Sequence, residues 1–376
     1  MTTSSFDFNL PDAQALPVTP CAPVAFDFER FEAHAAAADQ RYADFLSRPA
    51  GLAVWQRVRA GEVFRDACRD RTRSLHLQLG ALTRSLDYAT DAPMYLEPWY
   101  GIGTTASAFG AQYEWPEGQA PVVRPLYASL AETPPLVARP VSEAAILRET
   151  LATIEYFLVS TQGRLPLSWC DLQAPLNVAT ELIDTSAFFL GLIDQPQRAR
   201  EILAAVTDEL IRFTRQQSDL IGARLARPGH GFASARTGTG LGLSTDNLVM
   251  ISPRLFEEFC NADIARLGQA FGGAAIHSCG DYARWLPTLR KIPGLVMVDA
   301  AFSPRTDPRP NRPEAFRDAF AGTGVIVQAR LVAEPDEVLA LARRLWAPNL
   351  KLIVVTYEPD PDAQRRLYAD LHALCG

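Results

Sequence analysis

The sequence has no run of basic residues and no excess of positive charge. Among its 376 residues, 43 are Asp or Glu and 36 are Lys or Arg, which gives a formal net charge of −7 at pH 7. Proteins that bind the phosphate backbone of nucleic acids usually carry a basic patch or stripe. The composition therefore argues against a nucleic acid as the partner.

Long apolar runs are also missing. No stretch reaches the roughly 18 apolar residues that a membrane-spanning helix requires. Residues 1–7 lack the basic stretch and the apolar core of a signal peptide. We therefore expect a cytoplasmic protein that makes no contact with a membrane.

Paired cysteine spacings are absent as well. The six cysteines are scattered over the whole chain, at positions 21, 68, 170, 260, 279 and 375. A disulfide framework is typical of short secreted chains with regular cysteine spacing, so we expect reduced thiols that are mostly buried.

What the chain has in quantity is apolar residues, which make up 48% of it, against 21% charged residues. This balance is typical of a globular protein with a sizeable core. Residues 1–20 are polar and show no periodicity, so we predict a loose tail there. We predict a single domain over residues 21–376, with no internal repeat.

From residue 140 onward, short apolar segments alternate with helix-like patterns. The expected strands are residues 165–171, 241–246, 274–279, 295–301, 325–331 and 350–357. The expected helices are residues 175–192, 198–225, 253–271, 282–292, 313–320, 335–346 and 363–374. Such alternation indicates parallel strands joined by helical crossovers.

Two earlier segments, residues 23–28 and 93–98, raise the number of expected strands to eight, which is the number that closes a barrel. A doubly wound open sheet is the alternative, but it normally carries a Gly-rich phosphate-binding turn after its first strand. Gly101-Ile-Gly103 lacks the third glycine and the helix of such a turn. We therefore predict an α/β fold, a (β/α)8 TIM barrel.

Catalytic groups of such barrels lie at the C-terminal ends of the strands. We expect catalytic roles for Asp171, Asp246 and His277, although an Asp at a strand end also commonly caps a loop or helix. Residues expected to bind substrate at or near the same strand ends are Glu97, Trp169, Gln173, Gln328, Arg330 and Tyr357.

His277 and Cys279 are two residues apart on one expected strand, so their side chains point the same way, into the barrel mouth. An imidazole nitrogen and a thiolate sulfur together suit zinc. The alternative is a hydrogen-bonded histidine beside a packed cysteine, because a zinc site usually has three or four protein ligands.

The segment His277-Ser-Cys-Gly-Asp281 after an apolar strand, with the preceding residues 246–259, resembles the uroporphyrinogen decarboxylase superfamily. Residues 98–110 and 171–180 resemble the same superfamily, and the similarity covers roughly residues 20–372. The resemblance implies a barrel and a homodimer. The superfamily includes decarboxylases and zinc-dependent methyltransferases that work with corrinoid proteins or coenzyme M, so the fold alone does not settle the function.

In the true decarboxylases of the superfamily, an N-terminal basic motif binds the many carboxylates of a porphyrinogen. The segment expected to correspond, residues 22–31, is acidic in this chain. The resemblance therefore disfavours porphyrinogen decarboxylation.

In the methyltransferases, zinc is bound by a His-x-Cys pair and by a later cysteine near the last strand. This chain has His277 and Cys279 in that register, but its last strand ends at Tyr357 and Glu358 without a cysteine. A further ligand would have to come from Cys170, Asp299 or Glu358, and no pattern selects among them.

The resemblance thus implies a methyltransferase-like enzyme that transfers a methyl group to or from a small thiol or a corrinoid on a partner protein. Zinc would act by lowering the pKa of a bound thiol. Two alternatives remain open. One is a lyase or decarboxylase for a small carboxylated substrate, with His277 as base next to Asp299 or Asp246. The other is a non-catalytic barrel that binds a ligand or a corrinoid protein.

Overall fold

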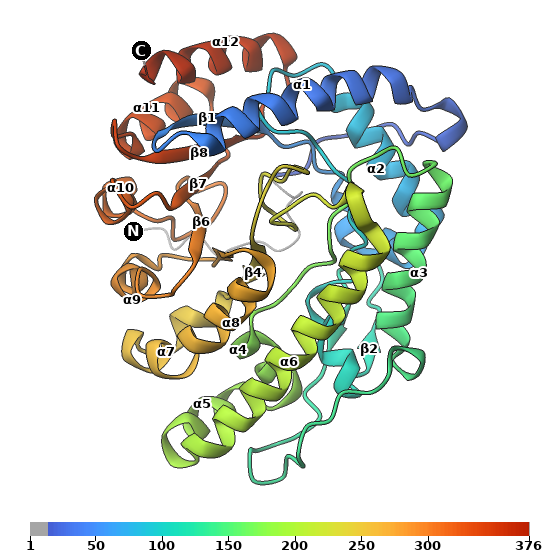
Figure 1. The fold of residues 1–376 in the computed structure, drawn as a ribbon, viewed down its shortest axis with the longest axis vertical. Coiled ribbons are helices and arrows are strands. Elements are labelled where there is room, and N and C mark those ends of the chain that lie inside the picture. The colour runs from blue at the N-terminus through green and yellow to red at the C-terminus, as the bar shows by residue number, and fades with distance from the viewer. Residues whose placement is uncertain (1–13, 376) are drawn as a thin grey trace.

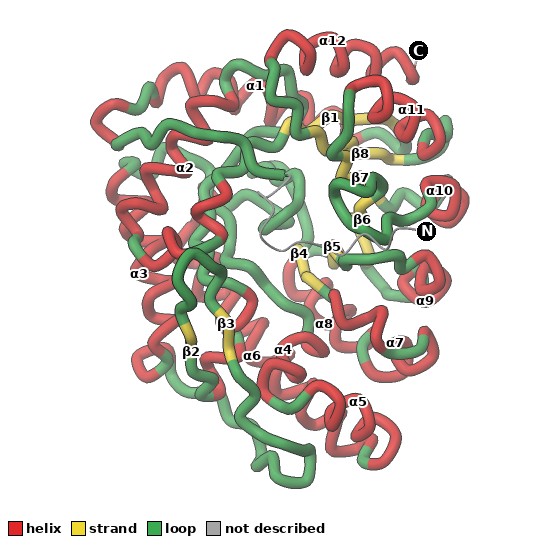
Figure 2. Tube along the Cα trace, turned by 180° about the vertical axis from the view of Figure 1, so that it is seen from behind, coloured by secondary structure: helices red, strands yellow, loops and turns green. Residues whose placement is uncertain are grey.

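The computed structural model describes residues 14–375, and its centre is a parallel sheet of six strands in the order β1-β8-β7-β6-β5-β4. The helices surround these strands on the outside (Figures 1 and 2). The strands are β1 (Gly51–Gln56), β4 (Leu241–Ser244), β5 (Ala274–His277), β6 (Leu295–Ala301), β7 (Ile326–Leu331) and β8 (Lys351–Thr356).

Two extended segments close the ring between β1 and β4, one with Asp91 and Leu96 and the other with Leu167 and Gln173. They make only isolated pairs with their neighbours. The N–H of Asp91 donates to the carbonyl of Val54 in β1 at 2.7 Å. Further along the two segments, Leu96 pairs with Leu167, and Gln173 pairs with Ser244 of β4, both in parallel. The predicted (β/α)8 barrel is therefore confirmed. The two extended segments stand in the place of its second and third strands and form only short, irregular contacts.

The first barrel strand lies later in the chain than the sequence analysis predicts. Residues 23–28 form a 3-10 turn, η1 (Pro23–Ala25), and the start of α1 (Phe28–Ser47). The side chain of Asp27 accepts a hydrogen bond from the N–H of Arg30 at 3.0 Å, which caps the first turn of α1. The predicted strand at 23–28 is therefore wrong, and β1 takes its place in the barrel.

The long helices of the sequence analysis are divided. The predicted helix over 175–192 is two helices, α4 (Pro175–Leu182) and α5 (Thr185–Asp194), and that over 253–271 is α7 (Pro253–Phe259) and α8 (Asn261–Phe271). A small antiparallel pair, β2 (Tyr113–Glu114) and β3 (Val122–Val123), lies outside the ring. The remaining helices are α2 (Arg71–Ser85), α3 (Ala145–Ser160), α4 (Pro175–Leu182), α5 (Thr185–Asp194), α6 (Pro196–Ile221), α7 (Pro253–Phe259), α8 (Asn261–Phe271), α9 (Leu286–Leu289), α10 (Pro313–Phe320), α11 (Pro335–Leu345) and α12 (Pro361–His372).

Strand residues alternate between two separate apolar clusters. Leu52 and Val54 of β1 belong to the large cluster between the strands and the helices. Ala53 and Trp55 belong to a second cluster, which also holds Ile353 of β8. Since successive side chains of a strand point to opposite faces, the second cluster is the barrel interior.

The connection between α6 and β4, residues 222–240, fills much of that interior. Phe232, Ala233 and Ala235 pack in the same cluster as Trp55, and Figure 1 shows this connection in the middle of the ring. A Cβ atom on Gly242 would lie 2.7 Å from the ring of Phe232, so the glycine makes room for the inserted connection.

The predicted loose tail covers residues 1–20, of which 1–13 lie outside the described residues. Leu16 is buried, and its N–H donates to the carbonyl of Arg59 at 2.9 Å. Residues 14–20 therefore include part of the packed structure.

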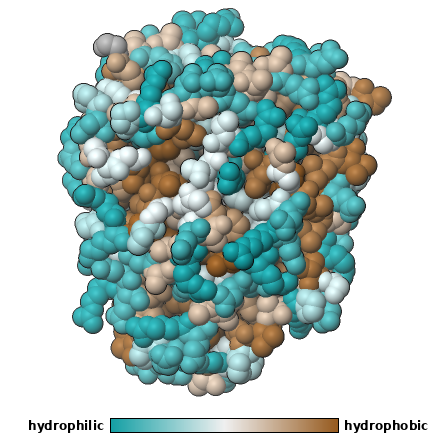
Figure 3. Space-filling view, in the orientation of Figure 1, coloured by the Kyte–Doolittle hydropathy of each residue, from teal (hydrophilic) through white to brown (hydrophobic). Residues whose placement is uncertain are grey.

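On the face shown in Figure 3, hydrophilic residues cover most of the surface and apolar residues form separate patches. Within residues 14–375, no helix combines the length and the apolar character needed to cross a membrane.

Candidate metal and substrate site

Neighbouring strands place four polar side chains at one end of the barrel interior. His277 of β5 pairs in register with Asp299 of β6, and Asp299 pairs with Gln328 of β7. Arg330 follows two residues after Gln328, on the same face of β7. These side chains end apolar strands and point inward, away from the helices.

A cavity of about 210 Å³ lies at these strand ends. Pockets for drug-sized ligands measure about 300–1,000 Å³, so this one suits a small substrate. Its wall combines three arginines, two histidines and three aspartates: the lining residues are Gln14, Arg57, Arg59, Ile102, Asp171, Gln173, His230, Gly231, Ser244, Asp246, His277, Asp299 and Arg330.

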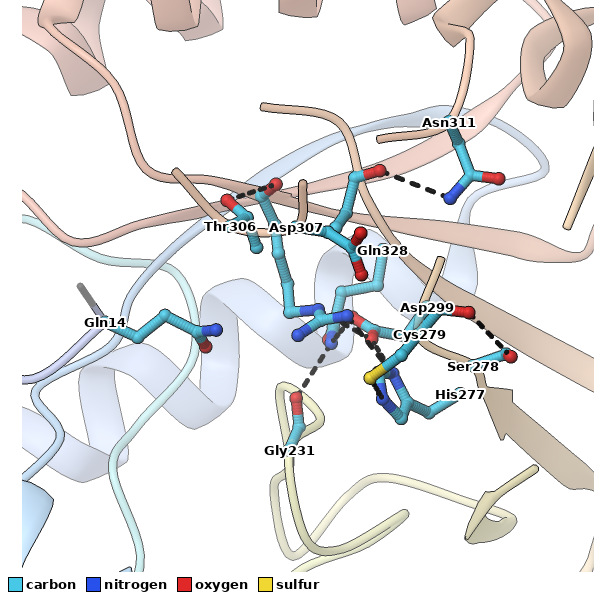
Figure 4. Close-up of polar contacts among 12 residues, drawn as sticks. Gln14, Gly231, His277, Ser278, Cys279, Asp299, Thr306, Asp307, Asn311 and Gln328 are labelled. Atoms are coloured by element: carbon cyan, nitrogen blue, oxygen red, sulfur yellow. Dashed lines mark hydrogen bonds and ion pairs between the residues drawn. The ribbon is translucent and has the colours of Figure 1, made fainter. Parts of the chain in front are cut away.

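Asp246, His277 and Cys279 bring a carboxylate oxygen, a ring nitrogen and a sulfur within 4.8 Å of one another. The Nε2 atom of His277 lies 3.5 Å from Sγ of Cys279 and 3.5 Å from Oδ1 of Asp246. Figure 4 shows the sulfur of Cys279 against the ring of His277. The N–H of Cys279 donates to Oδ1 of Asp246 at 2.7 Å, which holds the carboxylate in place.

These distances fit a tetrahedral zinc ion. Ligand atoms at zinc bond lengths of about 2.0–2.3 Å are roughly 3.3–3.7 Å apart around a tetrahedron. The two distances from His277 fall in that interval. Three protein ligands would leave one position open, as in catalytic zinc sites.

The other ring nitrogen of His277 is bound by a buried carboxylate. Nδ1 lies 2.6 Å from Oδ2 of Asp299, so a proton on Nδ1 would leave Nε2 with a lone pair for a metal. Asp299 is itself held by Nε of Arg330 at 2.9 Å and by Nε2 of Gln328 at 2.6 Å. Metal-bound histidines commonly have such a carboxylate behind them.

The charges around His277 act on both groups of this pair. Burial alone would raise the pKa of Asp299, but Arg330 and His277 hold it below its usual value. Burial and Arg330 lower the pKa of His277, while its hydrogen bonds to Asp299 and Cys279 outweigh them and raise it. Asp299 is therefore an ionised carboxylate that stabilises positive charge on Arg330 and His277.

A second polar cluster lines the same cavity. Nδ1 of His230 lies 2.5 Å from Oε2 of Glu97, and its Nε2 lies 3.7 Å from Oδ2 of Asp171. Asp171 accepts hydrogen bonds from Nε1 of Trp99 at 3.3 Å and Nε2 of Gln173 at 2.8 Å. Two carboxylates thus lie on the two sides of one imidazole ring.

Positive charge surrounds the buried Glu97. Burial would raise its pKa, but His230, Arg57 and Arg59 lower it. Burial lowers the pKa of Arg59 to about 10, although Tyr357 and Glu97 act against it. Glu97 is therefore an anion in the folded protein.

The predicted residues are divided between the cavity and its surroundings. Asp171, Gln173, Asp246, His277, Asp299 and Arg330 line it. Gln328 supports Asp299 from behind, and Glu97 supports His230. The hydroxyl of Tyr357 donates to the side chain of Gln14, which lines the cavity, at 3.1 Å.

Trp169, Cys170 and Glu358 lie elsewhere, contrary to the sequence analysis. Nε1 of Trp169 donates to Ser218 on α6, and Trp169 and Cys170 pack in the outer cluster with Leu167. Trp169 lies two residues after Leu167 on an extended segment, so both side chains point the same way, toward the helices. The carboxylate of Glu358 accepts from the N–H of Asp360, outside the cavity. The third ligand atom beside His277 and Cys279 comes from Asp246.

No sequence pattern singles out His230, Arg57 and Arg59 as residues of the site. His230 lies inside the connection 222–240 and follows no apolar strand. Arg57 directly follows β1 and Arg59 lies two residues further on, and the sequence analysis expected residues 23–28 in the place of β1. Residues 22–31 therefore do not correspond to the start of the barrel, so their acidity is no argument against porphyrinogen decarboxylation. The small cavity disfavours a macrocycle instead.

The fold and the site together define a (β/α)8 barrel with a His/Cys/Asp cluster at the strand ends. The family model "Uroporphyrinogen decarboxylase (URO-D)" matches residues 50–230, from the start of β1 to His230. The predicted resemblance to the uroporphyrinogen decarboxylase superfamily is confirmed over these residues.

A methyltransferase from Methanosarcina mazei has a similar structure. The TM-score is 0.62 at 13% sequence identity, and the similarity covers 90% of this chain and 99% of that one. At this identity the likeness supports the fold alone. No curated protein matches the chain in sequence.

Proposed function

We propose that this protein is a zinc-dependent, methyltransferase-like enzyme that transfers a methyl group to or from a small thiol or a corrinoid. The observation that supports this most directly is the cluster of Asp246, His277 and Cys279, with ligand atoms within 4.8 Å at a small polar cavity. A sulfur, a nitrogen and an oxygen ligand suit zinc better than magnesium or calcium, which prefer oxygen alone.

Bound zinc would supply a positive charge that stabilises the thiolate form of a substrate. The chain's own residues prepare the site for it. Asp299 binds Nδ1 of His277, which leaves Nε2 on the side of Cys279 and Asp246. Arg330 and Gln328 hold Asp299, so the orientation of the imidazole ring is fixed before any ligand binds.

The methyltransferase from Methanosarcina mazei has a similar fold over nearly its whole length, so this fold is compatible with methyl transfer. A corrinoid-carrying partner protein and a homodimer, both implied by the family resemblance, remain predictions.

Cobalt substitution tests the proposal. A thiol such as 2-mercaptoethanol that enters the open position of the Co²⁺-loaded protein should add sulfur-to-cobalt charge-transfer absorption. The zinc-loaded protein should then form a thioether from that thiol and methylcobalamin, as detected by mass spectrometry, and the variant Cys279→Ser should not. Absence of thiol binding, or thioether formation that persists without metal, would refute the proposal.

A carboxy-lyase for a small carboxylated substrate is a second candidate. It rests on the guanidinium groups of Arg57, Arg59 and Arg330 in the cavity wall, since arginine binds carboxylates in bidentate fashion. Metal removal separates the two candidates: it should abolish methyl transfer, whereas a lyase that relies on these arginines should keep its activity.

A further inference from the structure

The cavity contains an imidazole ring that the proposed metal centre does not use. His230 belongs to the connection 222–240, and its side chain is 20% exposed. It lines the same cavity as Asp246 and His277. A partly buried histidine between two carboxylates is typical of a general acid or base.

Glu97 fixes the tautomer of this ring. Its carboxylate is buried and lies 2.5 Å from Nδ1 of His230. A carboxylate can only accept a hydrogen bond, so Nδ1 carries a proton. Arg57 and Arg59 help to keep Glu97 ionised. In the neutral ring, the lone pair therefore lies on Nε2.

Nε2 is in position to exchange a proton with a ligand in the cavity. The distance of 3.7 Å to Oδ2 of Asp171 is longer than a hydrogen bond, although both residues line the cavity. Asp171 is already bound by Trp99 and Gln173, which keeps its charge near the ring. Its carboxylate would stabilise an imidazolium once Nε2 takes up a proton.

The backbone around His230 is held from several sides. The hydroxyl of Tyr95 donates to the carbonyl of Gly229 at 2.7 Å. Gln328 donates to the carbonyl of Gly231 at 3.0 Å and accepts from the N–H of Ala233 at 2.7 Å. The same Gln328 donates to Asp299, so one side chain joins the His230 loop to the support of His277 (Figure 4). The ring is therefore placed in advance, as catalysis by proton transfer requires.

We infer that His230 is the acid–base residue of the cavity and takes the proton of a thiol substrate, with Glu97 as a positioning residue. The inference rests on the proposed function. The S–H bond of the substrate breaks, its electron pair stays on sulfur, and the proton forms a bond to Nε2 of His230. The resulting imidazolium lies between Glu97 and Asp171, and the thiolate is ready to accept a methyl group.

Proton counting tests this assignment. Binding of 2-mercaptoethanol to the zinc-loaded protein is measured by calorimetry in buffers of different ionisation enthalpy, which gives the number of protons released. Because Gln cannot take up a proton, His230→Gln should release about one more proton per bound thiol than the unmodified chain. His76→Gln, the same change at a residue that does not line the cavity, should leave the proton count unchanged.

Either of two results would overturn the inference without touching the proposed function. One is equal proton release from His230→Gln and the unmodified chain while both bind the thiol. The other is an increase in proton release in Asp171→Asn alone, which would make Asp171 the base. Absence of thiol binding in the unmodified, zinc-loaded protein would instead refute the proposed function and this inference together.

A second measurement needs neither metal nor thiol. Nitrogen-15 spectra of the histidine rings in the metal-free chain, assigned with His230→Gln, should show His230 with its proton on Nδ1 and a lone pair on Nε2. The opposite tautomer would contradict the role given to Glu97. A loss of the Nδ1 preference in Glu97→Leu, with a circular dichroism spectrum like that of the unmodified chain, would support it.

Discussion

Each of the two imidazole rings in the cavity has a buried carboxylate on its Nδ1 atom, Asp299 for His277 and Glu97 for His230. In both cases the Nε2 atom is left for chemistry. The partners of Nε2 differ: His277 has a thiol and a carboxylate at 3.5 Å, whereas His230 has the carboxylate of Asp171 at 3.7 Å. The first arrangement suits a metal ion and the second a proton.

The carboxylate behind His277 should be needed for metal affinity. Replacing Asp299 by Asn keeps the shape and removes the charge that holds the ring, so zinc affinity should fall about 10- to 100-fold. Competition with a chromophoric chelator measures it. Asp318→Asn, an exposed change on α10, serves as the control. Unchanged affinity in a folded Asp299→Asn protein would contradict the role of Asp299.

At the residue scale, the strand-end rule works where a strand is regular. His277, Asp299 and Arg330 each lie near the end of an apolar strand. Because successive side chains of a strand point to opposite faces, their positions direct these three side chains into the barrel. Trp169 also follows an apolar run, but its side chain lies on the same side of the segment as that of Leu167, which points out of the barrel. His230 could not be found in this way, because tertiary contacts rather than a strand bring its loop into the barrel.

At the scale of elements, the last helix is attached to the first strand through one buried carboxylate. Asp91 accepts hydrogen bonds from Tyr368 at 2.6 Å and from the N–H of Val54 at 2.7 Å, and Nε2 of His372 lies 2.8 Å away. Burial would raise the pKa of Asp91, but these hydrogen bonds lower it. Asp91 therefore links α12 to β1.

The lowered pKa gives this link a defined pH dependence. Because the folded pKa lies below the unfolded value of about 3.9, the stabilisation is complete above that pH and is lost as pH falls through the folded pKa. Asp91→Asn should lower the free energy of unfolding by about 2 kcal/mol at pH 7, and by less below pH 4.

Urea denaturation at a series of pH values measures this difference in unfolding free energy. The exposed Asp87→Asn serves as a control. A difference that stays constant from pH 7 to below pH 4 would show that the charge of Asp91 contributes nothing.

The insertion of the connection 222–240 into the barrel depends on a missing side chain. A Cβ atom at residue 242 would lie 2.7 Å from the ring of Phe232 and 3.0 Å from the carbonyl of Pro228. Gly242→Ala should therefore cost about 1–3 kcal/mol of unfolding free energy, as overpacked cores do. Adding Phe232→Leu should recover part of the loss if the two positions are in contact. Additive losses in the double variant would rule out this contact as the cause.

Elements with plain periodicity are predicted well from the sequence. The helix at 313–320 and the strand at 295–301 have the predicted bounds. The predicted helix at 175–192 is interrupted because Asp184 caps a new helix through the N–H of Ala187. Residues 23–28 are apolar enough for a strand, but the cap at Asp27 starts a helix instead.

At the scale of the whole molecule, the alternation of strands and helices favours a closed barrel, since few other arrangements bury so many parallel strands. The predicted count of eight nevertheless included residues 23–28 in the place that β1 takes. The alternation could not locate the cavity wall, because that wall combines Arg57 and Arg59 after β1, the connection 222–240 and the ends of β4 to β7. These segments lie far apart in the sequence and meet only in the folded chain. The identity of the third ligand, Asp246, follows from that assembly.

X-ray absorption at the zinc edge of the reconstituted, full-length chain tests the central claim most directly. We expect about one zinc per chain with a single sulfur at about 2.3 Å and nitrogen or oxygen ligands at about 2.0–2.2 Å. Cys279→Ser should remove the sulfur shell, and Asp246→Asn should weaken binding. A protein that holds no zinc after reconstitution, or a sulfur shell that persists in Cys279→Ser, would contradict a metal centre built from Asp246, His277 and Cys279.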